Sequence, residues 1–257
     1  MLISIVTPTY NSEEYLEDCI LSIKNQKARN FEHIIIDGGS TDSTLSIIRK
    51  YENTYPMKWI SEPDNGMYDA IAKGFRLAKG EIYCWLNSDD MYMPWTCLAI
   101  EKIFKDKNVS WCTGVPAQIN PEGILYLISN KTIKYPDFCI KKGWMDGQRC
   151  GCIQQESSFW RKDLYNSVGG IDIKYKLAGD YHLWHKFAQK EKLFSYNTVL
   201  AGFRVHSGQK SQDRERYYSE AHEMTSVEKC LNSIKIYRTV NFCLKFATKV
   251  HEIREII

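Results

Sequence analysis

The first ninety residues alternate between short apolar runs and segments in which apolar residues recur at helical spacing. The apolar runs predict strands at residues 3–6, 33–36, 57–60 and 81–86. The amphipathic segments predict helices at residues 15–23, 45–51 and 67–78, with Asn11 or Ser12 capping the first and Gly80 closing the third. A repeat of strand and helix predicts a mainly parallel sheet with helices on both faces. The expected fold class is therefore α/β and Rossmann-like.

Polar residues follow every one of these predicted strands. The polar clusters are Thr9–Asn11, Asp37–Asp42, Glu62–Asn65 and Asn87–Asp90. The carboxyl ends of parallel strands meet at one edge of a sheet, and ligands bind at that edge. The sequence therefore predicts a polar ligand site built from all four clusters.

The segment Ser61–Asp90 joins an acidic turn, a predicted helix and a strand that ends on Asp89 and Asp90. Adjacent carboxylates after a buried strand repel each other, so we expect a hard divalent cation to compensate them. A helix cap before Met91–Pro94 is the alternative, and the preceding strand favours the metal. A metal held here would neutralise the charge of a leaving nucleoside diphosphate.

The cluster Asp37–Asp42 contains two glycines, which allow the backbone to approach a ligand closely. Asp37 is placed to accept a hydrogen bond from a base or a ribose. The cluster matches neither the dinucleotide fingerprint nor the P-loop, which argues against both chemistries. A tight turn in which Asp42 caps the next helix is the alternative.

The second half of the chain is less regular. We expect variable loops over residues 116–151, helices at 161–168 and 181–189, one or two strands within 194–205, and helix from 215 onward. Asp180 begins a predicted helix, where an aspartate is either a cap or the base that a transferase needs. His206 follows a predicted strand and is either structural or a neutral metal ligand, with Arg204 or Lys210 near enough to meet phosphate.

Composition excludes several classes. The net charge is +3. Residues 235–257 alone carry five basic and two acidic side chains, so the net charge of the remaining residues is zero. We therefore expect no nucleic-acid partner. The nine cysteines include no Cys-x-x-Cys pair, which favours reduced thiols in the cytoplasm. We find neither a signal peptide nor an apolar run long enough to span a membrane.

Seven motifs occur in an order that resembles family 2 glycosyltransferases with the GT-A fold. The motifs are TPTYN, DGGSTD, SEPDNGMYDAIAKG, LNSDD, QESSFW, GGID followed by AGDYHLW, and FRVHSGQKS. The chain is most similar to small bacterial enzymes of surface-polysaccharide synthesis. The resemblance covers about residues 1–210, and it implies an inverting transfer from a nucleotide-diphosphate sugar, with UDP favoured, to a hydroxyl of a saccharide acceptor.

The resemblance also implies site residues. Asp180 corresponds to the catalytic base, and Asp89, Asp90 and His206 correspond to positions that bind Mn²⁺ or Mg²⁺, with the choice between Asp89 and Asp90 left open. The donor-binding residues implied are Pro8, Tyr10, Asp37, Asp64, Lys73, Asn87, Ser88 and Asp89. Gly38, Asn87 and the segment Ala72–Gly74 depart from the family pattern, which leaves the donor base and sugar open.

The implied organisation is a GT-A domain at 1–210 with a helical tail at 211–257. Its half at 1–115 would bind the nucleotide sugar, and its half at 116–210 would bind the acceptor. The tail carries apolar residues on one face with basic residues between them, typical either of a packed helix or of one lying on an anionic membrane. The second reading suits a polyprenyl-linked acceptor and a peripheral place on the inner face of the cell membrane.

Two rival functions remain in view. A non-catalytic scaffold that binds a sugar nucleotide would not need Asp89, Asp90, Asp180 and His206 together. A sugar nucleotidyltransferase would need a glycine-rich basic loop near the N-terminus, whereas TPTYNSEEYL is acidic.

Overall fold

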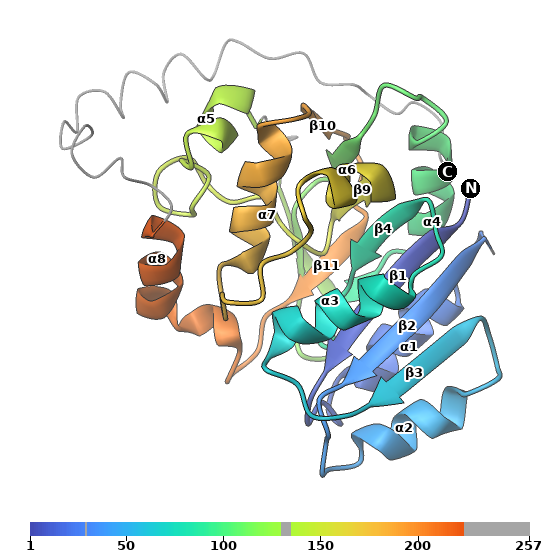
Figure 1. Ribbon diagram of the computed structural model, residues 1–257. Coiled ribbons are helices and arrows are strands. Elements are labelled where there is room, and N and C mark those ends of the chain that lie inside the picture. The colour runs from blue at the N-terminus through green and yellow to red at the C-terminus, as the bar shows by residue number, and fades with distance from the viewer. Residues whose placement is uncertain (29, 130–134, 224–257) are drawn as a thin grey trace.

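The centre of the protein is a seven-stranded sheet (Figure 1). The computed structural model describes residues 1–28, 30–129 and 135–223. The strands are β1 (Ile3–Thr9), β2 (Phe31–Asp37), β3 (Met57–Ser61), β4 (Ile82–Trp85), β6 (Trp111–Thr113), β9 (Ser158–Arg161) and β10 (Leu193–Ser195). Their order is β10-β6-β9-β4-β1-β2-β3, and every pairing is parallel except those of β9. The predicted parallel α/β sheet is confirmed, with one antiparallel strand inserted beside β4.

Helices cover both faces of this sheet because alternate residues of the buried strands point to opposite sides. Ile3 and Ile5 of β1 pack with α1 and α4, whereas Val6 packs with α3 and α7. On the first face lie α1 (Leu16–Lys24), α2 (Thr44–Tyr51) and α4 (Thr96–Ile103). On the second face lie α3 (Met67–Leu77), α5 (Asp137–Lys141), α6 (Lys162–Ser167) and α7 (Gly179–Ala188). The whole of β1 is buried, because it pairs with β2 on one side and with β4 on the other, and helices cover both of its faces.

A second sheet forms partly from residues that the sequence predicts to be variable loops and partly from a predicted strand within 194–205. Its strands are β5 (Met91–Tyr92), β7 (Ala117–Ile119), β8 (Leu125–Ile128) and β11 (Ala201–Arg204), in the order β5-β11-β7-β8. The expectation of loops throughout 116–151 is therefore wrong, because β7, β8 and α5 all lie there. Pairing of β11 with β5 brings the residues after position 200 against the end of β4.

The predicted caps of two helices are wrong. Helix α1 begins without a side-chain cap, and the Asn11 side chain accepts from the N–H of Thr41 instead (2.9 Å). Asn11 therefore ties the loop after β1 to the loop after β2. Helix α3 ends before Gly80, whose N–H donates to the Ser4 hydroxyl (2.8 Å) at the start of the sheet.

The last described elements are a short 3-10 helix (Lys210–Gln212) and α8 (Arg214–His222), which packs beside the start of α7 (Figure 1). Glu220 of α8 accepts three consecutive backbone N–H groups, those of Lys176, Leu177 and Ala178, at 2.9, 2.8 and 3.0 Å. The amphipathic residues of the tail, 235–257, lie outside the described residues. Within the described part, no helix has the length and apolar character that crossing a membrane requires.

Candidate active site

Asp37 ends β2 and is completely buried. Its carboxylate accepts from the N–H groups of Gly39 and Ser40 (both 3.0 Å) and from the Ser61 hydroxyl (2.7 Å). These bonds hold the turn and join it to the end of β3. Asp37 thus has a structural role, and its contact with a base or ribose stays a prediction. Pro8 is buried, and the side chain of Tyr10 is 61% exposed. Their contacts with the donor also stay predictions.

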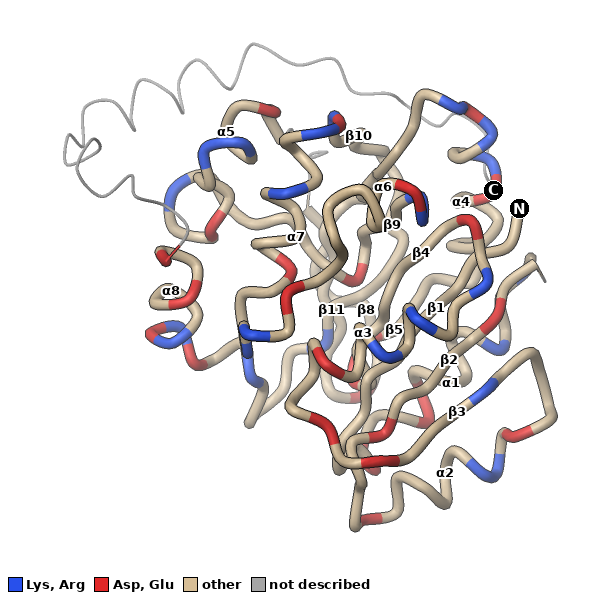
Figure 2. Tube along the Cα trace, in the orientation of Figure 1, with Lys and Arg blue, Asp and Glu red and all other residues tan. Residues whose placement is uncertain are grey.

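Asp64 lies directly over this turn. Its Oδ1 accepts from the N–H of Gly66 (2.7 Å), and a Cβ atom added to Gly38 would lie 2.7 Å from its Oδ2. A second acid at position 38 would therefore collide with Asp64 and repel it. Gly38, a departure from the family pattern, makes room for Asp64 at the mouth of the site. Figure 2 marks acidic residues in red along the loops that follow β2 and β3.

Lys73 is engaged by the protein itself. Its Nζ lies 2.9 Å from Glu62, 3.7 Å from Asp69 and 3.0 Å from the Pro63 carbonyl. The hydrogen bond to Glu62, with the other carboxylates nearby, raises the pKa of Lys73. The ammonium therefore fastens the loop that carries Asp64 to α3, and direct contact with a donor stays a prediction.

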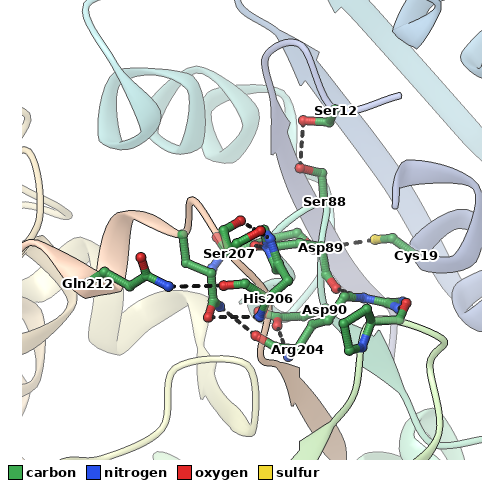
Figure 3. A network of polar contacts seen from close by, with 12 residues as sticks. Ser12, Cys19, Ser88, Asp89, Asp90, Arg204, His206, Ser207 and Gln212 are labelled. Atoms are coloured by element: carbon green, nitrogen blue, oxygen red, sulfur yellow. Dashed lines mark hydrogen bonds and ion pairs between the residues drawn. The ribbon is translucent and has the colours of Figure 1, made fainter. Parts of the chain in front are cut away.

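The two carboxylates after β4 point in different directions (Figure 3). Asp89 Oδ2 lies 3.1 Å from Nε2 of His206. Asp90 is 1% exposed, and its Oδ1 accepts from the N–H of Arg204 (2.9 Å). Burial, together with Asp89 and Glu156, raises the pKa of Asp90 well above its usual range. Asp89 therefore faces His206, and Asp90 faces the backbone of β11.

Arg204 is completely buried, so the expectation that it meets phosphate is wrong. Its Nε donates to the Asp89 carbonyl (2.6 Å), one terminal nitrogen pairs with Asp18 (3.0 Å), and the other donates to the carbonyl of Pro121. The guanidinium also lies over the ring of Tyr15 (4.6 Å). Arg204 joins α1, the end of β4 and the loop after β7, and so fixes the backbone of Asp89.

A divalent metal fits the pair formed by Asp89 and His206. The described residues hold no cluster of three His, Cys, Asp or Glu side chains that could bind a metal. Mg²⁺ and Mn²⁺ sites of transferases commonly use one or two protein ligands and take the rest from substrate phosphates and water. Asn87 and Ser88 line the approach, with Asn87 Oδ1 buried and unpartnered and Ser88 bonded to Ser12 (2.9 Å).

Asp180 is the second residue of α7 and is partly buried. The hydroxyl of Tyr68, on α3, donates to Asp180 Oδ1 and accepts from the Asp180 N–H, both at 3.3 Å. Burial raises the pKa of Asp180 to about 6. A Cβ atom on Gly179 would lie 2.7 Å from the Tyr68 ring, so glycine at that position allows the ring to reach Asp180. A carboxylate with this pKa suits a general base near neutral pH.

Three residues of the site had no role in the sequence prediction. Tyr68 and Glu220 hold Asp180 and the turn before it. Tyr68 belongs to the motif SEPDNGMYDAIAKG, which was its available signal, whereas no motif marks Glu220. Glu156 belongs to QESSFW, one of the seven motifs, which was the available signal. Glu156 is 3% exposed, and burial, with Asp180 and Asp89 adding to it, raises its pKa to about 8. The carboxyl therefore lies within electrostatic reach of both the predicted base and the predicted metal ligand.

A family model matches the first part of the chain. Residues 4–165 match the model described as Glycosyl transferase family 2, which spans more than half of the chain.

Curated relatives extend the match. The chondroitin synthase of Pasteurella multocida is 29% identical over 208 residues, covering 78% of this chain but 21% of the synthase. The hyaluronan synthase of Pasteurella multocida matches equally, and an uncharacterized glycosyltransferase of Rickettsia typhi is 27% identical over 219 residues, covering 81% of this chain and 65% of that protein. The chain thus spans about a fifth of the length of the two synthases.

Solved structures share the fold. Staphylococcus aureus TarS superposes with a TM-score of 0.61 at 19% identity, covering 89% of this chain and 67% of that one. The mannosyltransferase PcManGT of Pyrobaculum calidifontis, solved with GDP-Man and Mn²⁺, gives 0.65 at 20% identity, covering 86% of this chain and 64% of that one. TarS has also been solved with UDP-GlcNAc. The predicted GT-A fold is thereby confirmed.

Proposed function

This chain belongs to glycosyl transferase family 2, and we propose that it transfers a sugar from a nucleoside diphosphate to a hydroxyl of a saccharide acceptor. One observation carries the proposal. The Asp180 carboxylate, whose pKa is raised to about 6, contacts Tyr68 at the start of α3, and Asp89, paired with His206, lies after β4, so both groups lie beyond the carboxyl ends of the parallel strands. The first suits proton removal, and the second suits a charged leaving group.

The donor would bind across the ends of β1, β2 and β4. UDP-GlcNAc and GDP-Man in the structural neighbours support a nucleotide-sugar donor, and we favour a UDP-sugar. Pro8, Tyr10 and Asp37 would line the base and ribose, and Asp64 would close the pocket. Lys73 would act through the Asp64 loop rather than by its own contact, because its ammonium already bonds Glu62.

A divalent cation, Mn²⁺ or Mg²⁺, would be held by Asp89 and His206, and when bound it supplies positive charge against the leaving diphosphate. Asp90 is the weaker candidate, because it bonds the Arg204 backbone and its raised pKa disfavours the carboxylate that a metal needs. Asn87 and Ser88 would contact the donor beside Asp89.

The chain's own chemistry is a single displacement that inverts the sugar. Asp180 takes the proton of the acceptor hydroxyl as its oxygen bonds to the anomeric carbon, and the bond to the diphosphate breaks. Tyr68 keeps the carboxylate oriented through its hydrogen bond. Holding the acceptor oxygen in line with the leaving group accounts for much of the rate gain expected of such a site.

Calorimetric titration with UDP, GDP and dTDP, each with and without Mn²⁺, tests the proposal. We expect metal-dependent binding of one diphosphate and slow hydrolysis of its sugar derivative. Binding without hydrolysis or transfer to any acceptor would favour the scaffold reading. Absence of binding in all six titrations would contradict the proposed function.

For the acceptor, we propose a growing bacterial surface polysaccharide on a polyprenyl lipid, at the cytoplasmic face of the membrane. The names of the two synthases support a polysaccharide product. Basic residues between apolar ones at 235–257 would hold the protein on anionic lipid. Co-sedimentation with anionic liposomes should be weaker for a chain ending near Asn232, and equal partition would rule this anchor out.

A further inference from the structure

Unpartnered polar atoms gather beside the end of β4. Among the described residues, thirteen buried side-chain N or O atoms have no hydrogen-bond partner. Five of them belong to two short segments, and they are Asn87 Oδ1, Asp90 Oδ2, Gln155 Oε1, Glu156 Oε1 and Ser157 Oγ. Buried polar atoms in proteins nearly always have partners, so such a concentration points to a ligand that supplies them.

The turn that carries three of these atoms is firmly held. The N–H of Ser158 donates to the Gln155 carbonyl (3.0 Å), and the N–H of Gly114 donates to the Ser157 carbonyl (3.2 Å). Gln155 Nε2 donates to the Trp85 carbonyl (2.6 Å) at the end of β4. The turn is therefore held by hydrogen bonds, while each of its three successive side chains keeps an oxygen without a partner. A poorly ordered loop would not explain these unpartnered oxygens.

The position of Glu156 relates the turn to the reaction. Asp89 and Asp180 both raise the pKa of Glu156, and Glu156 in turn raises that of Asp90. Under the proposed function, the leaving diphosphate lies at Asp89 and the attacking hydroxyl lies at Asp180. The sugar ring must lie between those two groups. The hydrogen bond from Gln155 to the Trp85 carbonyl holds the turn of Gln155–Ser157 at the end of β4, the strand that leads to Asp89.

We propose that Gln155, Glu156 and Ser157 form the subsite that hydrogen-bonds the hydroxyl groups of the transferred sugar, with Glu156 as its specificity-determining residue. This inference rests on the proposed function and adds the class of sugar. The Gln155 oxygen accepts hydrogen bonds, and the Glu156 carboxyl and the Ser157 hydroxyl can accept or donate them, which matches the hydroxyl groups of a neutral hexose or N-acetylhexosamine, since those groups also do both.

The charge of the subsite excludes an acidic sugar. The charged groups that act most strongly on Glu156 and Asp180 are all carboxylates, namely Asp180, Asp89 and Glu220. Arg204 is the cation that lowers the pKa of Asp90. It is buried, and its side-chain nitrogens already bond Asp89, Asp18 and Pro121. A uronate carboxylate would enter this field without a partner, so we infer that the enzyme rejects uronic acid donors.

The test compares sugar nucleotides with the free diphosphate. Affinities of UDP, UDP-glucose, UDP-galactose, UDP-GlcNAc and UDP-glucuronate are measured by calorimetry with Mn²⁺, with GDP and GDP-mannose as a second series. Wild-type protein should bind one neutral sugar nucleotide, and UDP-glucuronate more weakly than UDP. Glu156→Gln should lose about 10- to 100-fold in affinity for the neutral sugar nucleotide while its affinity for the diphosphate stays unchanged.

Two further variants separate site from fold. Glu32→Gln neutralises another buried glutamate of the same sheet, away from the site, and should leave the ratio of sugar-nucleotide to diphosphate affinity unchanged. Ser157→Ala should lower that ratio in the same direction as Glu156→Gln. An equal loss for diphosphate and sugar nucleotide in Glu156→Gln, no loss for either, or preferred binding of UDP-glucuronate by wild type would overturn the inference. If no diphosphate binds wild type, the proposed function itself fails first.

Discussion

Buried polar groups differ between the amino ends of β1 and β2 and the carboxyl end of β4. At the amino ends of β1 and β2, Glu32 accepts from the Ser4 hydroxyl (2.7 Å), the N–H of Lys79 (2.6 Å) and the Lys58 ammonium (3.1 Å). Ser4 in turn accepts from the N–H of Gly80. Burial raises the pKa of Glu32, but these bonds outweigh it and lower the pKa below its usual value.

Asp37, at the carboxyl end of β2, is likewise paired, whereas the polar groups beside the end of β4 are left open. Glu156, Asp90 and Asn87 are buried or partly buried, each with an unpartnered oxygen, and the pKa values of the two acids are raised. A closed network stabilises a fold, whereas an open one lowers stability until a ligand completes it. The sheet therefore has a closed network at the start of β1 and β2 and an open one beside the end of β4, and the pairing state of buried oxygens distinguishes the two regions.

The largest expected effect lies at the open end. Asp180→Asn should lower kcat about 10²- to 10⁴-fold, because an amide cannot accept the proton of the acceptor hydroxyl. The Kd of the nucleoside diphosphate should be unchanged, since Asp180 lies on the acceptor side. Steady-state rates and calorimetry on one preparation measure both quantities, and loss of diphosphate binding would refute the assignment of Asp180.

The next largest effect should distinguish the pair of Asp89 and His206 from Asp90 in the response to metal. His206→Ala should weaken activation by Mn²⁺ at least about 10-fold, as expected when a contact at a metal site is removed. Asp90→Asn should keep the metal response, because Asp90 bonds the backbone of Arg204. Manganese titrations of activity measure the difference. If Asp90→Asn were the variant that lost the metal response, the two roles would be reversed.

A substitution in the closed network around Glu32 should change the stability of the fold without changing donor binding. Glu32→Gln replaces a charged acceptor of three hydrogen bonds, and it should lower the free energy of unfolding by about 1–3 kcal/mol. Chemical denaturation at pH 7 measures this loss. Sugar-nucleotide affinity should stay at the wild-type value, and a fall in that affinity would show that the two ends are not independent.

The two ends should also differ in pH dependence. The pKa of Glu156 is raised from 4.5 to about 8, so its stabilising contribution is complete below pH 4.5 and is lost as pH rises through 8. Glu156→Gln removes that loss and should raise the unfolding free energy at pH 9 by about 1–3 kcal/mol relative to wild type. Glu32, whose pKa is lowered, stabilises above its unfolded pKa and loses that effect in acid. Thermal unfolding midpoints at pH 5 and pH 9 provide the measurement, and a less stable Glu156→Gln at pH 9 would contradict it.

The smallest effect should come from the loop at the mouth of the site. Lys73→Met removes a partly exposed ion pair with Glu62, which is worth at most about 1 kcal/mol. We expect KM for the donor to rise by a few-fold with kcat unchanged, because the Asp64 loop is held less firmly. Initial rates at varied donor concentration measure the two constants. A collapse of kcat would mean that Lys73 touches the reacting groups.

Local patterns were enough to predict the parallel sheet and its polar edge. Helical spacing and apolar runs depend on neighbouring residues, so the first four strands and three helices follow from them. Asp89 and His206 lie 3.1 Å apart because the loops that follow β4 and β11 meet, while their role at a metal stays a prediction. Long-range pairing was beyond such patterns: β9 inserts antiparallel beside β4, and this insertion brings Glu156 into the site. The burial of Arg204 depends on contacts with Asp18 and Pro121, which are distant in sequence.

The carboxylate of Glu220 has a consequence for modular engineering of this chain. The turn that leads into Asp180 is held by a side chain more than forty positions later, through three consecutive amides. A chimaera joined at residue 210 would therefore leave those amides open unless its new segment brought an equivalent acceptor. The unit to keep intact in recombination therefore extends through α8, and a module boundary drawn after the last recognisable motif would remove the support of the turn that leads into Asp180.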